Sequence, residues 1–312
     1  MSLSEPKPHA PTPGTADPGT ADQRTPVTLK ALARMAREGT PFACLASYDA
    51  TTARWLERGG VHCILAGDSA AEVILGLPRT AEMPLEVSIA LTAAVKRGAP
   101  NTVIMADLPF GSYHESDEQA VRTATRYIRE ARADIVKLEA DASFASTVAH
   151  VTRAGIPVCA HVGSLPQRAA LTSGYTSAGR SADAAIDIIK DALALEAAGA
   201  TMLLIEAVPP LVTDALLART RIPIIGIGAG TAAHGQILVV NDLLGLTDAP
   251  PRFAEPAEAL GARIQAAGQT WANRVKERNI GGQAYTMPAE QADLFRNRLA
   301  HLDETTRNKP PS

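Results

Sequence analysis

The sequence predicts a (β/α)8 TIM barrel, a closed ring of parallel strands surrounded by helices. Short apolar runs, too short for free-standing helices, recur along the chain, and amphipathic stretches at helical spacing separate most of them. Their alternation over about 200 residues is typical of this barrel. A doubly wound open sheet is the alternative, but such sheets usually have fewer strands. No Gly-x-Gly-x-x-Gly motif follows the first apolar run, which weakens a dinucleotide-binding interpretation.

The elements can be placed in order along the chain. Residues 1–26 are rich in Pro, Thr, Gly and Ala, which predicts a disordered arm because such a segment buries too little surface to offset its ordering entropy. Thr28 is a candidate cap for a helix that runs to Arg37. The expected strands are 42–47, 61–67, 102–107, 134–139, 156–161, 201–206, 222–227 and 236–240. The expected helices between them are 50–58, 85–97, 116–131, 143–154, 182–198 and 210–219.

Two connections and the C-terminal part stand out from this alternation. The stretches 69–83 and 162–181 are long for barrel loops and follow strand ends, which favours a functional role. A helix near 254–277 follows the last strand as a C-terminal extension. The predicted organisation is an arm, a catalytic barrel domain and a polar tail, at residues 1–26, 27–280 and 281–312.

Composition narrows the class of protein. The chain has 312 residues, 46% of them hydrophobic, and a formal net charge of -3, so it offers no basic surface for nucleic acid. We expect no membrane partner, because no run of about 18 uncharged apolar residues occurs. The first residues lack a signal-peptide pattern. Cys44, Cys63 and Cys159 lie in strand-like runs, which predicts reduced thiols and a cytoplasmic location.

Carboxylates stand at the ends of three successive predicted strands, as Asp68, Asp107 and Glu139. Converging in a barrel mouth, they would repel one another unless a cation lay between them. Oxygen ligands favour a hard ion, with Mg²⁺ the default and Mn²⁺ an alternative. The other interpretation is that each carboxylate caps a helix or meets its own basic partner. Three matched positions favour a shared metal site.

Four further polar residues stand at or next to strand ends. Lys137 precedes Glu139 by two residues, so both point to the same side of the strand, and it could hold a substrate carboxylate or only neutralise charge. Ser69 could donate to the same carboxylate or simply start a turn. His161 is either a site residue or a satisfied core histidine. Glu206 is the candidate general base, or else the partner of a nearby arginine.

Several short motifs stand in an order shared with one enzyme family. They are Gly67-Asp68-Ser69, Ala106-Asp107-Leu108-Pro109-Phe110, Val136-Lys137-Leu138-Glu139, Pro157-Val158-Cys159-Ala160-His161 and Glu206-Ala207-Val208-Pro209, with the segments 191–200 and 224–230. With them the chain resembles the ketopantoate hydroxymethyltransferase family over about residues 28–253.

The resemblance implies a fold and an activity. The family is a Mg²⁺-dependent barrel related to phosphoenolpyruvate mutase and isocitrate lyase, commonly assembled as a decameric homo-oligomer. It transfers a hydroxymethyl group from 5,10-methylenetetrahydrofolate to 3-methyl-2-oxobutanoate, giving 2-dehydropantoate for pantothenate biosynthesis through a magnesium-bound enolate. By motif, Asp68 and Asp107 would bind the metal, and Glu139 would hold it directly or through water.

The same resemblance implies roles toward the substrate. Ser69, Asp107 and Lys137 would contact the oxoacid. His161 would line the site, and Glu206 would accept the proton.

Two loops depart from the family pattern. In the 70–84 loop, Ala70-Ala71-Glu72 replaces the usual Leu-Gly-Met after Gly-Asp-Ser, and residues 78–84 replace the usual Asp-Ser-Thr-Leu-Pro-Val-Thr. In the 173–176 loop, Thr176 replaces the Lys of Gly-Gly-Tyr-Lys. In the helix that follows the first loop, Ala90-Leu91-Thr92 replaces the usual Tyr-His-Thr. A divergent Mg²⁺-dependent lyase or transferase acting on another 2-oxoacid is therefore one alternative. A catalytically silent assembly paralogue is another, although the polar strand ends speak against it.

Overall fold

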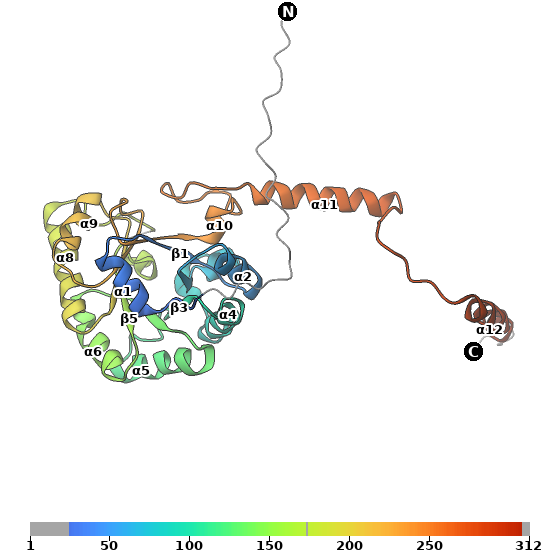
Figure 1. Ribbon diagram of the computed structural model, residues 1–312, viewed down its shortest axis with the longest axis horizontal. Coiled ribbons are helices and arrows are strands. Elements are labelled where there is room, and N and C mark those ends of the chain that lie inside the picture. The colour runs from blue at the N-terminus through green and yellow to red at the C-terminus, as the bar shows by residue number, and fades with distance from the viewer. Residues whose placement is uncertain (1–24, 173, 308–312) are drawn as a thin grey trace, which may run out of the picture. The chain divides into compact units, whose positions relative to one another are not determined.

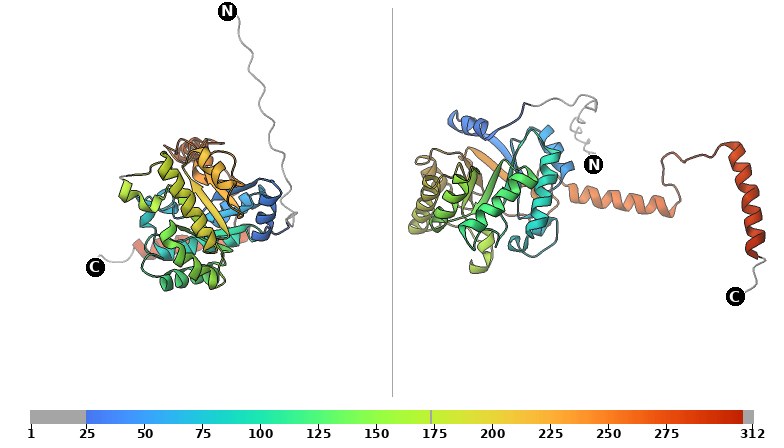
Figure 2. Two further views of the ribbon diagram at one scale, coloured as in Figure 1. Left: turned by 90° about the vertical axis from the view of Figure 1, so that its left-hand side faces the viewer. Right: turned by 90° about the horizontal axis from the view of Figure 1, so that it is seen from below.

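The computed structural model describes residues 25–172 and 174–307. In this part of the chain, eight parallel strands pair in sequence order and close into a barrel, with the last strand beside the first. Helices surround the strands (Figures 1 and 2). The strands are β1 Phe42–Ala46, β2 Cys63–Ala66, β3 Val103–Asp107, β4 Ile135–Glu139, β5 Val158–Gly163, β6 Met202–Glu206, β7 Ile224–Ile227 and β8 Gly235–Val239. The predicted (β/α)8 barrel is confirmed.

The main helices lie where the periodicity predicts them. They are α1 Leu29–Arg37, α2 Ala50–Arg58, α4 Leu85–Gly98, α5 Asp117–Arg126, α6 Ala145–Arg153, α8 Ala182–Ala197 and α9 Pro210–Leu217. Thr28 caps α1 by accepting a hydrogen bond from the Ala31 N–H. The helix predicted over 116–131 is instead α5 followed by the π-helical turn η2 Tyr127–Ala131, whose wider winding leaves Tyr127 and Ala131 buried.

Both long connections contain short helical segments. The stretch 69–83 holds α3 Ala70–Val73 and η1 Thr80–Glu82, and the stretch 162–181 holds η4 Pro166–Arg168 and α7 Ala169–Thr172. The remaining short segments are η3 Ala142–Phe144, after β4, and α10 Val240–Leu243, directly after β8. Hydrophobic periodicity does not reveal such single helical turns, because a repeating pattern needs a longer stretch of sequence than three or four residues.

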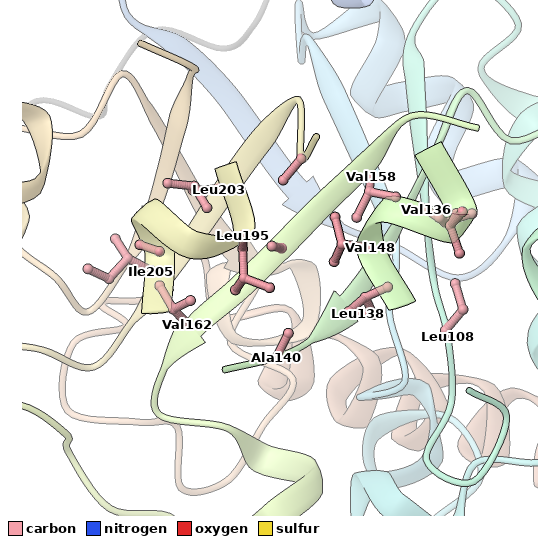
Figure 3. Close-up of a cluster of buried hydrophobic side chains, with 14 of the residues drawn as sticks. Leu108, Val136, Leu138, Ala140, Val148, Val158, Val162, Leu195, Leu203 and Ile205 are labelled. Atoms are coloured by element: carbon pink, nitrogen blue, oxygen red, sulfur yellow. The ribbon is translucent and has the colours of Figure 1, made fainter. Parts of the chain in front are cut away.

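Side chains alternate between two packed regions on the middle strands. Val136, Leu138 and Leu203 point outward and pack against Val148 of α6 and Leu195 of α8 (Figure 3). The inward side chains form a separate apolar cluster that includes Met105, Ile135, Cys159, Met202 and Leu204. Two neighbouring residues of a strand therefore belong to different layers, as the pleat requires.

The inward-facing row of residues changes from apolar to polar toward the end of each middle strand. Ile135 of β4 is followed two residues later by Lys137 and then Glu139, and Cys159 of β5 is followed by His161. In β3 and β6 the same rows end in Asp107 and Glu206. The barrel floor is thus hydrophobic, and its mouth carries the charged groups. All three cysteines are free and buried.

The chain divides after Ala259 into the barrel unit and a C-terminal unit. The C-terminal unit contains α11 Leu260–Lys276 and α12 Ala289–Arg307, so the predicted helical extension is present. The predicted start of this helix at 254 is wrong, because Pro256 disfavours helical backbone in the residue before it. The predicted domain boundary at 280 stays a prediction.

Some sequence predictions fall outside the described residues. These are positions 1–24 of the predicted arm, Ser173 in the 173–176 loop, and 308–312 at the end of the tail. Among the described helices, none is long and apolar enough to cross a membrane.

Candidate active site at the barrel mouth

A cavity of about 840 Å³ lies at the carboxyl ends of the barrel strands. All the site residues proposed from the sequence line it, although they come from five different strand ends: Asp68, Ser69, Asp107, Lys137, Glu139, His161 and Glu206. Parallel strands of a barrel end on the same face, which is why residues far apart in sequence meet there. The structure places these residues together; their individual roles stay predictions.

Lys137 is the central cation of the cluster. Its Nζ lies 2.8 Å from Asp107 Oδ1 and 3.4 Å from His161 Nδ1. Since an ammonium can only donate, His161 Nδ1 accepts, and the ring proton of a neutral imidazole sits on Nε2. That Nε2 lies 3.4 Å from Glu206 Oε2. Lys137 and His161 therefore connect Asp107 to Glu206 across the barrel mouth.

The cluster carries more negative than positive charge. Burial and the neighbouring Asp68 raise the pKa of Asp107 to about 7. Burial also raises the pKa of Glu139 well above its ordinary value, and the same two aspartates add to the effect. Burial alone would lower the pKa of Lys137, but the surrounding carboxylates outweigh it and the pKa is raised. The raised pKa of Lys137, despite its burial, reflects the surplus of carboxylates around this one ammonium.

The donor set suits a hard divalent cation. The described residues hold no pre-assembled group of three His, Cys, Asp or Glu side chains around one point. However, Glu139 Oε1 is buried and has no hydrogen-bond partner in the described part of the chain, and the carboxylates of Asp68 and Asp107 line the same cavity. The Asp68 N–H donates to Asp107 Oδ2 at 3.1 Å, which keeps the two groups adjacent. Carboxylate oxygens with surplus negative charge are the ligands that Mg²⁺ prefers.

Gln167 of η4 is a site residue that sequence analysis missed. Its Nε2 donates to Asp68 Oδ2 at 2.8 Å and to the Leu108 carbonyl at 3.0 Å. Its backbone N–H donates to Glu139 Oε2 at 3.0 Å, and its Oε1 accepts from the Tyr113 hydroxyl at 2.8 Å. One buried residue thus holds two site carboxylates in place, Asp68 through its side-chain amide and Glu139 through its backbone N–H. The length of the 162–181 connection was the signal for a functional loop, but nothing in the sequence singled out this glutamine.

Ser69 and Glu206 are the remaining predicted site residues that line the cavity. The Ser69 hydroxyl lies 2.8 Å from the Tyr48 hydroxyl, and Ser69 also begins α3 without capping it through its side chain. The Glu206 side chain is 20% exposed, whereas those of Asp107 and Glu139 are nearly fully buried. In the described chain its neighbour is the neutral His161, whose Nε2 lies 3.4 Å from Glu206 Oε2, and no arginine pairs with it there. Glu206 is therefore the carboxylate of this strand-end cluster that a ligand reaches most easily.

Comparison with known proteins identifies the family. The sequence model of ketopantoate hydroxymethyltransferase matches residues 26–282. The chain belongs to the ketopantoate hydroxymethyltransferase family. The 3-methyl-2-oxobutanoate hydroxymethyltransferase of Shouchella clausii (strain KSM-K16) is 39% identical over 260 residues, covering 83% of this chain and 93% of that protein. The enzyme of the same name from Hyperthermus butylicus (strain DSM 5456 / JCM 9403 / PLM1-5) is 42% identical over 260 residues, covering 83% and 90%. The predicted family is confirmed, and the protein is an enzyme.

Solved structures share the fold of this ketopantoate hydroxymethyltransferase family member. Phosphonopyruvate hydrolase in complex with oxalate and Mg²⁺ has a TM-score of 0.57 at 14% identity, covering 90% of this chain and 98% of that one. The 2,3-dimethylmalate lyase, a member of the PEP mutase/isocitrate lyase superfamily, has a TM-score of 0.54 at 14% identity, covering 91% and 98%. At this level of identity the likeness concerns the barrel alone.

Proposed function

We propose that the protein transfers a hydroxymethyl group from 5,10-methylenetetrahydrofolate to 3-methyl-2-oxobutanoate, giving 2-dehydropantoate. Its membership of the family supports the reaction. The observation that carries the proposal is the arrangement of Lys137, the crowded carboxylates and the accessible Glu206 around one cavity. Such a set can hold an anionic oxoacid and remove a proton beside its carbonyl group.

Lys137, Ser69 and the carboxylates that would bind Mg²⁺ hold the oxoacid. Lys137 provides a buried positive charge for its carboxylate, and the Ser69 hydroxyl provides a hydrogen-bond donor. Asp68 and Asp107 would hold Mg²⁺, with Glu139 acting directly or through water. When bound, the ion supplies positive charge that polarises the carbonyl oxygen and acidifies the adjacent C–H.

Proton removal falls to Glu206. Its carboxylate takes the C3 proton of the oxoacid, while His161 Nε2, at 3.4 Å, orients it. The resulting enolate carbon then bonds to the one-carbon unit of the folate. Water supplies the hydroxyl oxygen as the two carbon–nitrogen bonds between the one-carbon unit and the folate break. One proton from water and the proton taken by Glu206 go to the two folate nitrogens, and tetrahydrofolate leaves. Burial of the neighbouring charges keeps bulk water from competing for the proton.

Glu72 is the observation that favours a second candidate, the same chemistry on a different oxoacid. It lines the cavity, and its carboxylate accepts a 2.7 Å hydrogen bond from the Tyr175 hydroxyl, where the family pattern has an apolar residue. A larger or more polar oxoacid would contact this pair. Assaying tetrahydrofolate release with a panel of 2-oxoacids decides between the two substrates.

The experiment that tests the proposed function is hydrogen exchange at C3 of 3-methyl-2-oxobutanoate in deuterated water, followed by NMR with Mg²⁺ and without folate. The wild-type protein should exchange this hydrogen. Glu206→Gln keeps the shape but cannot accept the proton, so exchange should slow by about 10² to 10⁴. The matched control is Glu118→Gln, an exposed position on α5, which should exchange like wild type. Wild-type-like exchange in Glu206→Gln would move the base elsewhere, with His161 next in line.

A further inference from the structure

Asp242 is a buried acidic residue at the cavity wall. It lies in α10, directly after β8, is 5% exposed and lines the cavity. In the described part of the chain its side chain has no hydrogen bond or ion pair. A carboxylate that lines a cavity with no donor beside it among the described residues is available to accept hydrogen bonds from a ligand.

A second polar group in the same segment is also unsatisfied. Thr247, five residues after Asp242, lines the cavity, and its Oγ1 is buried without a hydrogen-bond partner among the described residues. The proposed steps on the oxoacid use neither group. Asp242 in α10 and the Thr247 hydroxyl just after it line the same cavity, which indicates a preformed binding site beside the strand-end cluster around Lys137.

The neighbouring wall is suited to a flat ring. Phe253 lines the cavity, and its aromatic ring packs so closely over Gly228 that a Cβ there would lie 2.5 Å from a ring atom. The glycine thereby fixes where this ring sits. Arg252, next to it, also lines the cavity. The volume of about 840 Å³ is in the range of drug-sized ligands and exceeds what a small branched oxoacid fills.

We propose that Asp242 and Thr247 bind the pterin edge of the folate, a flat heterocycle that presents adjacent N–H donors. Its ring N–H and exocyclic amino group match the two oxygens of one carboxylate in a bidentate pair. Thr247 Oγ1 can accept or donate at the same ring, and Phe253 offers its apolar surface to the ring face. This subsite rests on the proposed function and names how its second substrate is recognised.

The test is tetrahydrofolate binding by calorimetry to the Mg²⁺-loaded full-length protein, together with the Michaelis constants of both substrates. Asp242→Asn keeps the shape but replaces an acceptor oxygen with a donor that opposes the ring N–H. It should weaken tetrahydrofolate binding and raise the KM for the folate by at least about tenfold. The KM for the oxoacid should stay within about twofold of wild type. Thr247→Val should weaken tetrahydrofolate binding by a smaller factor. This second variant tests the same subsite if Asp242→Asn does not fold.

The matched control is Asp248→Asn, the same substitution at an exposed position of the same loop that does not line the cavity. It should bind tetrahydrofolate like wild type. Unchanged tetrahydrofolate binding in both Asp242→Asn and Thr247→Val would overturn the subsite. So would a loss of Mg²⁺ or oxoacid affinity in Asp242→Asn without a loss of folate affinity. C3 exchange by the wild type, measured without folate, tests the proposed function separately, because it needs no donor.

Discussion

At the scale of single residues, the site depends on whether a charged side chain points into the barrel or outward toward the helices. Lys137 and Glu139 face the barrel interior while Leu138 between them packs outward against the helices. A side chain moved by one position would enter the apolar layer instead of the mouth. The carboxylates crowd because the barrel brings β2, β3 and β4 together at their ends, and their mutual repulsion is what a cation would relieve.

Removing one carboxylate should therefore remove the cation. We expect Asp68→Ala and Asp107→Ala each to abolish tight Mg²⁺ binding, measured by calorimetry, while circular dichroism shows an intact fold. Metal-free stability of Asp68→Ala should be unchanged or slightly higher, since repulsion falls. Asp107→Ala should lose stability, because it removes the 2.8 Å partner of the buried Lys137 ammonium. Asp141→Ala, which removes a carboxylate outside the cavity wall, is the control for Mg²⁺ binding.

The pH dependence of Mg²⁺ binding provides an independent check on the same site. The pKa of Asp107 is raised to about 7, so below that pH the cation must displace a proton. Affinity should fall as the pH drops from about 8 to 6, rather than only near the ordinary aspartate pKa of about 4. A Mg²⁺ affinity that is constant over this range, or that survives both alanine substitutions, would remove these residues from the metal site.

At the scale of elements, loops rather than strands hold the site in its working shape. Gln167 links the connection after β5 to Asp68, 99 residues earlier in the chain, and Tyr175 of the same connection reaches Glu72. Gly163 joins β5 to this connection with a positive φ of 96°. Its Ser164 neighbour donates its backbone N–H to the Glu206 carbonyl at 2.9 Å, so the end of β5 also fixes the end of β6.

Gly163→Ala should disturb the proposed base through the backbone. A Cβ at this position would lie 2.5 Å from the Glu206 carbonyl oxygen, so the end of β6 must shift. We expect a loss of about 1 to 3 kcal/mol in the free energy of unfolding, from strain and clash together. Exchange at C3 should slow as well, because the Glu206 carboxylate moves with its backbone.

The matched control for this substitution is Gly155→Ala. Gly155 has a similar φ of 86°, but a Cβ there would meet nothing within 4 Å. It should lose stability through backbone strain while exchange stays at the wild-type rate. Equal effects of the two substitutions on exchange would show that the contact with Glu206 does not matter.

At the scale of the whole molecule, the C-terminal unit presents apolar side chains. α11 has no buried residue, and Ile264, Trp271 and Val275 are exposed on it. Their spacing places all three on one face of the helix. Large apolar side chains gathered in this way are typical of a surface that is covered on association. We propose that another copy covers this face in the homo-oligomer that the family resemblance implies.

A charge on this face should disrupt assembly. Trp271→Asp is expected to lower the mass measured by light scattering, because an ionised carboxylate cannot be buried there without a partner. Gln269→Asp, the same charge on the opposite side of α11, should leave the mass unchanged. A wild-type mass for Trp271→Asp would mean that this face takes no part in assembly.

Sequence alone determined the barrel and the charged residues at its strand ends, because both depend on short-range regularities. Strand-length apolar runs separated by helical periods predict the closed sheet, and the two-residue spacing of Lys137 and Glu139 predicts that they share a side. The family motifs added the expected roles. Residues 1–24, which were expected to form a disordered arm, lie outside the described structure.

The tertiary structure alone decided which partners the site residues find. Gln167 meets Asp68 and Glu139, and Asp242 is buried at the cavity wall, although neither position carries a local pattern that marks it. Such contacts join segments far apart in sequence, and their existence depends on how the barrel closes and how its loops fold back over the mouth. Periodicity describes only neighbours along the chain, so burial and pairing across the barrel emerge when the strands are assembled.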